Sequence, residues 1–562
     1  MNPTDFIGDF TERVAESLLP LLTSLGSEGL ADRIVLERPA ARGHGDLSTN
    51  IAMVTTKSAK LPPREIAQKM VDCLQDSICI MDLCEKVEIA GPGFINFFLS
   101  GKAIADAALG ALAQGRDYGS GTASQPESIL LEYVSANPTG PLHAGHARYA
   151  AYGDSLKRIL SFAGHQVTSE FYINDFGSQM DIFGKSLAAR YAELWGRKVQ
   201  FPEDGYHGDY TVHIARMIKD EIGDSQLAGS DPEPDPSTIS FFRKRGCELV
   251  LDEVRSVLQR FGVVFDEWFS EADLYEGDAV RKALAILTDA GELSVKDGAS
   301  WLLTTRHGDD KDRVLIRSSG EPTYFASDIA YHQLKLSRGF DRLINIWGAD
   351  HHGYIARMKA VFTALGHDPD KLEIIIGQLV NVIELGERKQ MSKRKGTMVS
   401  LEELIDNIGA DASRFYLVDR SADSTLDLDL EKAKLKSEEN PVYYVQYAHA
   451  RICSILKRTE EIRADSGDSD PYDSLEVEER ELVMKLTEFP RTVAGAADSR
   501  SPQRLTAYSR DLAAVFHVFY HNCPVLKASP DIARFRLDLC RLTRNVIAQS
   551  LNLVGVDAPE SM

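Results

Sequence analysis

A short apolar run followed by a loop rich in Pro and Gly is the feature that most constrains the fold of this chain. Residues 128–134 (SILLEYV) have the continuous apolar character of a strand buried on both faces of a parallel sheet. The loop 135–140 follows, and its turn residues predict that a helix begins near Leu142. Strand, tight loop and helix in this order open a nucleotide-binding βα unit.

Later segments repeat this pattern. Strands are predicted at 342–347 and 373–376, with a helix at 354–365 between them. The stretch 195–300 has helical flanks around a Pro-rich loop and is predicted to be an insertion. We therefore predict an α/β fold whose Rossmann-type parallel-sheet domain covers residues 125–400 and carries an inserted subdomain.

The two ends of the chain have different patterns. Residues 1–115 alternate helical patterns with two short strand patterns around Gly91-Pro92-Gly93, which predicts an α+β domain. After Leu401 only helical patterns are found. We predict a connecting helical region at 401–436 and an all-α bundle at 437–562.

Composition excludes several classes of protein. No apolar run reaches the ~18 residues that a membrane-spanning helix needs, and the first residues lack the basic and apolar parts of a secretory signal. The seven cysteines are scattered and form no C-x-x-C pair, which argues against a disulfide framework and a thiolate zinc site. We expect a cytoplasmic protein without a structural metal or a membrane partner.

The net charge of −21 argues by itself against a nucleic-acid partner, because Lys and Arg make the contacts to phosphate. Two stretches run against this average, 385–400 and 431–458, where basic residues outnumber Glu. On charge alone, these stretches can equally be solvated basic faces.

Residues 136–146 (ANPTGPLHAGH) form the first chemical motif. His143 and His146 lie three apart on the first turn of the predicted helix, beside free backbone N–H groups that attract phosphate. Gly145 leaves room for a nucleotide ring against the backbone. Without further evidence the histidines can also be a helix-capping or metal-binding pair.

Residues 389–396 (KQMSKRKG) form a second motif. Lys393 can meet negative charge that develops on pyrophosphate in a transition state, and Gly396 permits loop movement. Without the first motif, this segment would be interpreted as a solvated basic loop.

Together and in this order, the two motifs resemble the HIGH and KMSKS elements of class I aminoacyl-tRNA synthetases. The first departs only at Ala144, and in the second Gln390 stands where the family usually has its first Lys. The resemblance implies that His143, His146 and Lys393 stabilise the transition state. It also implies that ATP, bound with Mg²⁺ as a substrate, is contacted by Pro138, Gly140, His143, Gly145, His146, Met391, Ser392 and Lys393.

Over nearly the whole chain, the resemblance narrows to bacterial arginyl-tRNA synthetases. It is carried by RGHGD at 42–46, GPGFIN at 91–96, EYVSANP at 132–138, YINDFGSQ at 172–179, YFASDIAY at 324–331, GADHHG at 348–353, DASRF at 411–415 and YYVQYAHAR at 443–451. It implies a monomer that activates arginine with ATP to arginyl-adenylate and transfers it to the 3′ end of tRNA(Arg), releasing AMP and pyrophosphate. It further implies an additional N-terminal domain that contacts the outer corner of tRNA, and no DNA partner.

Recognition of arginine requires acceptors, because a guanidinium offers five N–H donors and accepts nothing. Glu132 and Asn137 emerge from the carboxyl end of the first predicted strand, where such sheets bind ligands. Tyr324 and Asp328 are four residues apart and share one face if helical. We predict that these four residues and His352 bind arginine. Alternatives are a cap or surface charge for Glu132 and a core salt bridge for Asp328.

The resemblance also implies that Asn50 and Phe94 in the N-terminal domain contact tRNA. In the helical domain we predict contacts from Tyr443, Tyr447 and Arg451, which combine stacking surfaces with charge. Two other functions stay open at this point. One is a HIGH-type nucleotidyltransferase or synthetase for a different acid, and the other is a tRNA-binding paralogue without catalysis.

Overall fold

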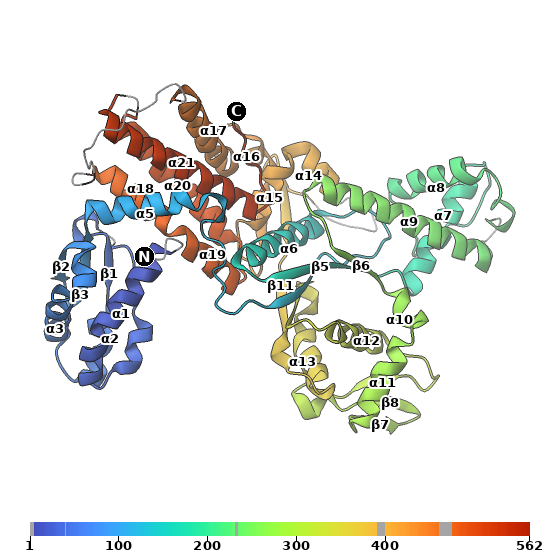
Figure 1. The fold of residues 1–562 in the computed structure, drawn as a ribbon. Helices are drawn as coiled ribbons and strands as arrows, with labels where there is room; N and C mark the ends of the chain where they lie inside the picture. Colours follow the sequence, from blue (N-terminus) through green and yellow to red (C-terminus); the bar gives the residue numbers. More distant parts are fainter. Residues whose placement is uncertain are drawn as a thin grey trace.

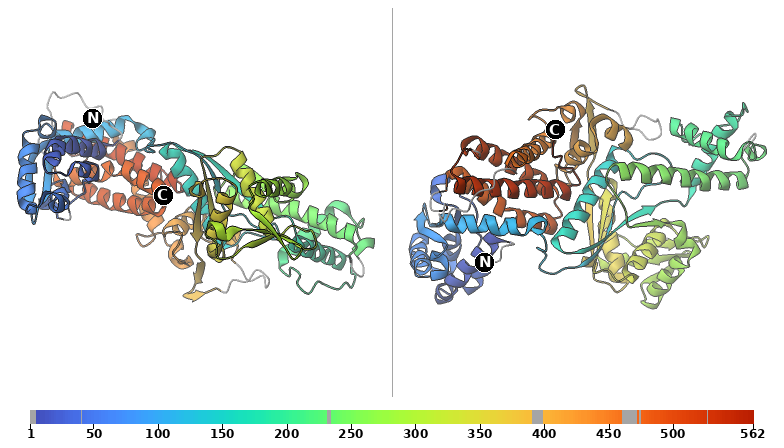
Figure 2. Two further views of the ribbon diagram at one scale, coloured as in Figure 1. Left: turned by 90° about the horizontal axis from the view of Figure 1, so that it is seen from below. Right: turned by 45° about the horizontal axis from the view of Figure 1, so that its top comes forward.

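The computed structural model describes residues 5–39, 41–230, 234–389, 399–459, 472, 475–525 and 527–562. The molecule is elongated, with a central sheet, a helical bundle and a small α/β domain on one side, and a helical arm on the other (Figures 1 and 2). Within the described residues, no helix is long and apolar enough to cross a membrane.

The central sheet has five parallel strands in the order β11-β10-β4-β5-β6, which confirms the predicted fold class. Its strands are β4 (Ser128–Glu132), β5 (Gln166–Ile173), β6 (Glu267–Ser270), β10 (Arg342–Gly348) and β11 (Leu372–Gly377). From β4, the chain adds β5 and then β6 on one side of the sheet. It then crosses to the other side of β4, where it adds β10 and β11. The strand order therefore reverses between β4 and β10, and ligands bind at such switch points, outside the carboxyl ends of the strands.

The apolar run in β4 is explained by burial on both faces. Ile129 and Leu131 point into the larger core beside α6, whereas Leu130 points into a second core formed with α12 and α13. The three covering helices are α6 (Ala144–Ala163), α12 (Tyr324–Ser337) and α13 (Ile355–Ala364).

The segment around residues 195–300, which was predicted to be one insertion, belongs to two separate insertions into the sheet domain. The first is the arm, built from α7 (Ser178–Glu193), α8 (Asp209–Ile222) and α9 (Pro236–Arg260). The second contains α10 (Ala272–Glu276), α11 (Ala279–Asp289), β7 (Leu293–Lys296), β8 (Ala299–Leu302) and β9 (Arg313–Ile316). Between them, β6 returns to the sheet beside β5, so part of the range 195–300 belongs to the central sheet. A strand of four residues is too short to stand out against its helical flanks.

A second small sheet follows β11. It consists of β12 (Val380–Glu384), β13 (Glu387–Arg388) and β14 (Leu426–Asp429), beside α14 (Leu401–Ile408), α15 (Ala410–Val418) and α16 (Leu430–Lys434). The prediction that residues 401–436 are purely helical was wrong, because β14 pairs in parallel with β12. The alternation of buried Leu426 and Leu428 with Asp427 and Asp429 is the sequence signal for this strand.

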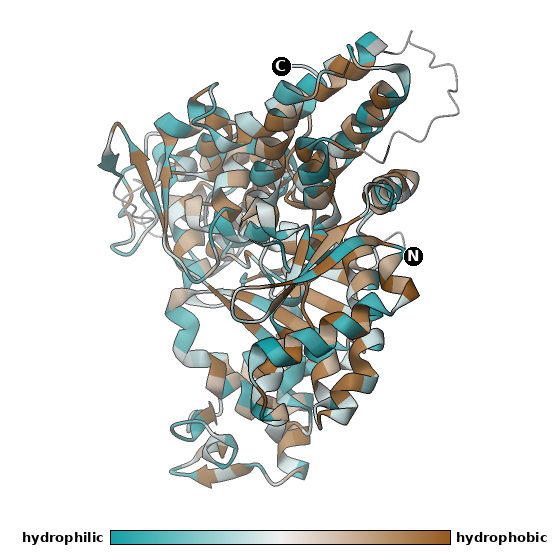
Figure 3. Ribbon diagram, turned by 90° about the vertical axis from the view of Figure 1, so that its left-hand side faces the viewer, coloured by the Kyte–Doolittle hydropathy of each residue, from teal (hydrophilic) through white to brown (hydrophobic). Residues whose placement is uncertain are grey.

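The N-terminal domain packs against the C-terminal bundle. Its antiparallel sheet has the order β1-β3-β2 and consists of β1 (Leu47–Thr49), β2 (Cys84–Ala90) and β3 (Phe94–Leu99), with α1 (Phe6–Ser24), α2 (Ile51–Ala59), α3 (Pro63–Gln75) and α4 (Ile78–Met81). The bundle comprises α17 (Pro441–Thr459), α18 (Val477–Thr487), α19 (Phe489–Asp498), α20 (Gln503–Asn522) and α21 (Pro530–Leu553). Along its helices, hydrophobic and hydrophilic bands alternate (Figure 3), as expected where one face of each helix is buried. Helix α5 (Gly101–Ala113) packs on α18 and α21, and Asp46 pairs with Arg480 at 2.8 Å, so the two domains are joined directly.

Candidate active site

The loop after β4 has an unusual backbone. Val134 has φ 71° and Ser135 has φ 40°, both in the left-handed region. A β-branched residue there is a conformational outlier with a cost of ~1–3 kcal/mol, and such strain clusters at functional sites. The Ser135 hydroxyl donates to Glu132 Oε1 at 2.8 Å and accepts from the Tyr172 N–H at 3.3 Å. The loop is therefore held across the carboxyl ends of β4 and β5.

The two histidines of the first motif stand at the beginning of α6. His143 is the N-cap, its Nδ1 accepts from the Gly145 N–H at 3.1 Å, and His146 Nδ1 accepts from the His143 N–H at 3.3 Å. The two rings are stacked, with their centroids 3.8 Å apart. The capping role considered from the sequence is thus present, and the imidazoles lie at the positive end of a 20-residue helix. A Cβ at Gly145 would come 2.9 Å from His143 Cε1, so the His143 ring occupies that space.

Residues 390–398, which include Met391, Ser392 and Lys393 of the second motif, lie outside the described residues, but the segment from Val399 is described. The Ala144 N–H donates to the Val399 carbonyl at 3.0 Å. The Leu401 N–H donates to the Leu142 carbonyl at 2.8 Å. The chain that follows the second motif is therefore bonded to the backbone of the first, although ~250 residues separate the two motifs in the sequence.

Four carboxylates gather at the carboxyl ends of the strands. Glu132 ends β4, Asp175 follows β5, Glu271 follows β6, and Asp328 lies on α12. The Ala272 N–H, next to Glu271, donates to Asp175 Oδ1 at 3.1 Å, and the four groups lie close enough that Asp328 and Asp175 raise the pKa of Glu271 and Glu132 raises that of Asp328. The cationic partner of Glu132 is Lys335, whose side chain is fully buried. Glu132 is thus neither a helix cap nor a surface charge, since it forms a buried ion pair.

Asp328 and Glu271 differ from Glu132, because neither forms an ion pair with any described residue. Burial, together with the charge of Glu132, raises the pKa of Asp328 to about 6. Burial, together with the charges of Asp328 and Asp175, raises the pKa of Glu271 to about 7. The core salt bridge considered for Asp328 is not found in the described part of the chain. The cluster carries more negative charge than its surroundings balance, so it suits a cationic ligand.

The other residues predicted to bind arginine are Tyr324, Asn137 and His352, and they lie outside the group of four carboxylates. Tyr324 is 62% exposed at the beginning of α12, and its hydroxyl would lie 3.2 Å from a Cβ placed on Gly177. The Asn137 amide donates to Gln179 Oε1 on α7. His352 is exposed on the short helix η6 (Ala349–Tyr354), which follows β10.

Sequence reasoning missed two carboxylates of the cluster, Asp175 and Glu271, and it missed Tyr354, which donates a hydrogen bond to the cluster. Glu271 stands directly after β6, the short strand that was not predicted. Tyr354 donates its hydroxyl to Asp328 Oδ2 at 2.5 Å, although the two residues are 26 positions apart. A strand prediction for 267–270 would have placed Glu271 at the ligand edge of the sheet, whereas no local pattern indicates the contact of Tyr354.

The bundle has a basic, aromatic pocket of about 550 Å³. Tyr443 and Tyr447 on α17 stack with centroids 6.2 Å apart, and Arg451 donates to the Tyr447 hydroxyl at 3.1 Å. The pocket is lined by Arg451, Ile455, Arg458, His517, Tyr520, His521, Pro524, Val525 and Lys527. Arg451, which the sequence analysis predicted to contact tRNA, is thus one of the basic residues that line the pocket, and Tyr447 lies beside it.

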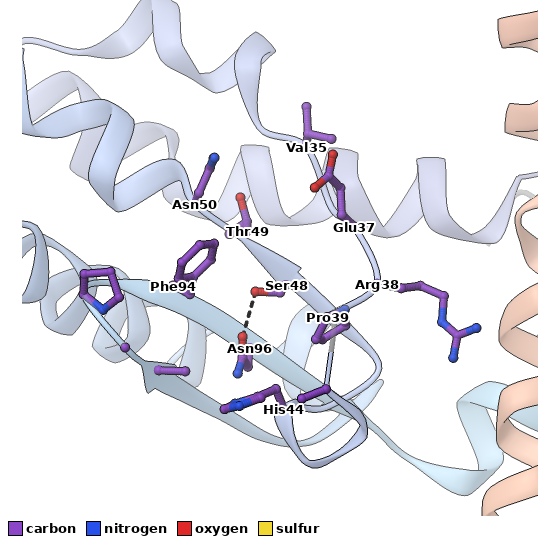
Figure 4. Close-up of a pocket in the computed structure, with 14 residues that line it drawn as sticks. Val35, Glu37, Arg38, Pro39, His44, Ser48, Thr49, Asn50, Phe94 and Asn96 are labelled. Atoms are coloured by element: carbon purple, nitrogen blue, oxygen red, sulfur yellow. Dashed lines mark hydrogen bonds between the residues drawn. The ribbon is translucent and has the colours of Figure 1, made fainter.

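The N-terminal domain has its own pocket of about 660 Å³, with Asn50 and Phe94 among its lining residues (Figure 4). The Phe94 ring is 39% exposed. Asn96 Oδ1 accepts from the Ser48 hydroxyl at 2.7 Å, which orients the amide. Its Nδ2 is buried and has no partner among the described residues. An aromatic face beside an amide with unused donors suits a planar ring that carries acceptors, such as a nucleobase.

Comparisons with known proteins agree along the whole chain. The family model "Arginyl tRNA synthetase N terminal domain" matches residues 9–99, "tRNA synthetases class I (R), catalytic domain" matches 109–452, and "DALR anticodon binding domain" matches 445–562. The arginine–tRNA ligase of Geobacillus thermodenitrificans is 44% identical, over 99% of this chain and 100% of its own. The enzyme of that name from Shouchella clausii is 44% identical over 96% of this chain and 97% of its own. The arginyl-tRNA synthetase structure from Thermus thermophilus shares the fold, with a TM-score of 0.77 at 22% identity, over 99% of this chain and 100% of that one. The chain therefore belongs to the arginine–tRNA ligases, a family of class I aminoacyl-tRNA synthetases.

Proposed function

We propose that the chain activates arginine and charges tRNA(Arg) at the switch point between β4 and β10. The supporting observation is that Asp328 and Glu271 gather with Glu132 at the carboxyl ends of the strands, and that neither of the two forms an ion pair with a described residue. A carboxylate oxygen of arginine attacks the α-phosphate of ATP, which gives arginyl-adenylate and releases pyrophosphate. A hydroxyl of the terminal tRNA ribose then attacks the arginyl carbonyl, and AMP leaves as the ester forms. Positioning and charge stabilisation dominate the first step.

In this proposal, the guanidinium of arginine binds between Asp328 and Glu271, with Tyr324 on the open side. Glu132 is already paired with Lys335 and supplies acceptor lone pairs to the α-ammonium group. Asn137 and His352 complete the arginine site. A flat guanidinium can bond to two carboxylate oxygens at once, whereas the ammonium of lysine cannot, so arginine is preferred over lysine.

ATP, with Mg²⁺ as part of the substrate, binds over the N-terminus of α6. His143, His146 and Lys393 stabilise the charge that develops on the phosphates. Other contacts to ATP come from Pro138, Gly140, Gly145, Met391 and Ser392. The positive end of α6 supports this placement, because backbone N–H groups there attract phosphate.

We assign tRNA binding to both ends of the chain. The N-terminal domain (1–115) holds one base of the tRNA on Phe94, with Asn50 at the rim and Asn96 donating to the base. The helical domain (437–562) binds the anticodon through Tyr443, Tyr447 and Arg451. The parts between them are a catalytic domain (125–400) and a connecting region (401–436), and the enzyme acts as a cytoplasmic monomer.

Phe94→Ala is expected to raise the KM for tRNA and to leave the KM values for arginine and ATP unchanged. Stacking of one base on an aromatic ring is worth ~1–3 kcal/mol, so the increase is roughly 5- to 150-fold. Steady-state charging with tRNA as the varied substrate measures it. Ile78→Ala, which removes another exposed apolar side chain of the same domain, is the matched control. If both variants changed the KM for tRNA by the same small factor, the pocket of Phe94 would not be part of the tRNA interface.

Pyrophosphate exchange with each of the amino acids, with and without tRNA, tests the function itself. Of all the amino acids tested, only arginine should support pyrophosphate exchange. Exchange with another amino acid would favour a synthetase for a different substrate. A lack of exchange and of charging under every condition would favour a tRNA-binding paralogue without catalysis.

A further inference from the structure

Tyr354 is held rigidly beside the carboxylate cluster. Its hydroxyl donates to Asp328 Oδ2 at 2.5 Å. The Arg357 guanidinium lies 4.4 Å from the centre of its ring. Edge-on contacts with Phe325 and Trp347, at centroid distances of 5.9 and 6.0 Å, fix the ring from other directions. With the ring enclosed, the hydroxyl has little freedom to leave Asp328.

We propose that Tyr354 is a positioning residue for arginine: its O–H keeps the carboxylate of Asp328 ionised and correctly oriented for the guanidinium. This inference rests on the proposed arginine site. Tyr354 occupies one lone pair of Oδ2. It leaves Oδ1 and the second lone pair of Oδ2 for the two parallel N–H groups of the substrate. The tyrosine acts through Asp328 and needs no contact with arginine.

Burial and the neighbouring acids oppose ionisation of Asp328. Burial raises its pKa to about 6, and the hydrogen bond from Tyr354 is the strongest influence that lowers it. The other charged groups that face Asp328 are Glu132 from β4, Glu271 from the segment after β6, His351 from η6 and Arg357 from α13. All of them remain when only the phenol oxygen is removed. In Tyr354→Phe, the pKa of Asp328 should therefore rise.

The test is the pH dependence of the arginine KM in the full-length Tyr354→Phe enzyme. In the native enzyme, the KM falls as pH rises through about 6 and about 7, because the ionised carboxylates of Asp328 and Glu271 bind the cation. In the variant this fall should occur at a higher pH. At pH 7 the KM should be roughly tenfold above the native value, because the carboxylate has lost a hydrogen bond that stabilises its charged form. The difference should shrink toward pH 9, and kcat should stay close to the native value.

A structural role would have a different signature, with the KM raised by the same factor at every pH. That result, or an unchanged KM, would overturn the inference. Tyr275→Phe is the control, because its phenol contacts the Ser327 hydroxyl and not the carboxylate. Its pH profile should match that of the native enzyme.

The Asp328→Asn variant separates this inference from the proposed site. A large increase in arginine KM in Asp328→Asn, together with a native profile in Tyr354→Phe, would reject only the role of Tyr354. A native KM in Asp328→Asn would reject the arginine site, and the role of Tyr354 with it.

Discussion

Replacing Asp328 by Asn is expected to raise the KM for arginine at least a hundredfold, with little change in the KM for ATP. The amide keeps the shape of the side chain but removes its charge. Leaving one partner of a buried ion pair unmatched costs ~3–5 kcal/mol, and every ~1.4 kcal/mol is a factor of ten. Steady-state charging with arginine, lysine and citrulline measures the effect on both proteins. Citrulline has the shape of arginine without the charge, so the native enzyme should reject it and the variant should reject it less.

Asp350→Asn is the matched control for this prediction. Asp350 is an exposed carboxylate on η6 that pairs with His351 at 3.4 Å. Its loss should leave the arginine KM close to native, because exposed ion pairs contribute only ~0–1 kcal/mol. Equal arginine KM values for native enzyme and Asp328→Asn would mean that Asp328 is structural.

Arg414→Met is expected to lower the free energy of unfolding by ~3 kcal/mol or more. Arg414 is 1% exposed and bonds to three other parts of the chain. Its guanidinium donates to Asp154 on α6 at 2.6 Å, to the Phe261 carbonyl at the end of the arm at 3.0 Å, and to the Val554 carbonyl after α21 at 3.1 Å. The variant leaves two buried carbonyls without this donor. Arg158 still pairs with Asp154 at 2.7 Å, which limits the loss.

Urea unfolding followed by far-ultraviolet circular dichroism measures this loss. Arg541→Met is the control, because its guanidinium pairs with Asp538 on the same helix and is 47% exposed. Exposed pairs of this kind are worth ~0.3–0.5 kcal/mol. Equal urea midpoints for the two variants would show that the bonds of Arg414 to the bundle, the arm and α6 do not contribute to the free energy of unfolding.

The parts of the fold that the sequence predicted have strong local signals. The strand at 128–132 has an unbroken apolar centre, 129–131, because both of its faces are covered, and the helix after it begins at a turn of Pro and Gly. The strands β6 and β14 were missed because each has only four residues, and β6 lies between long helical segments. Pattern reasoning needs longer windows than these strands provide.

The sequence predicted several residues of the candidate site, but it did not predict which of the carboxylates have a cationic partner. Asp328 and Tyr324 share a face of α12, as their spacing indicates. The pairing of Glu132 with Lys335 joins residues 203 positions apart, and the proximity of Glu271 to Asp328 depends on how the strands assemble. These contacts decide which carboxylates lack a cation. They arise from tertiary packing, which a single sequence does not display.

Arginine binding measured by calorimetry in buffers of different ionisation enthalpy tests the central claim most directly. If Asp328 and Glu271 hold the substrate, their pKa values of about 6 and about 7 must fall when the guanidinium binds. Binding at pH 6.5 should then release protons to the buffer and strengthen as pH rises. At pH 8, where both groups are mostly ionised before arginine binds, proton release should be much smaller than at pH 6.5. Arginine binding that is tight but releases no protons at pH 6.5 would contradict this account, because the cation would then be held elsewhere.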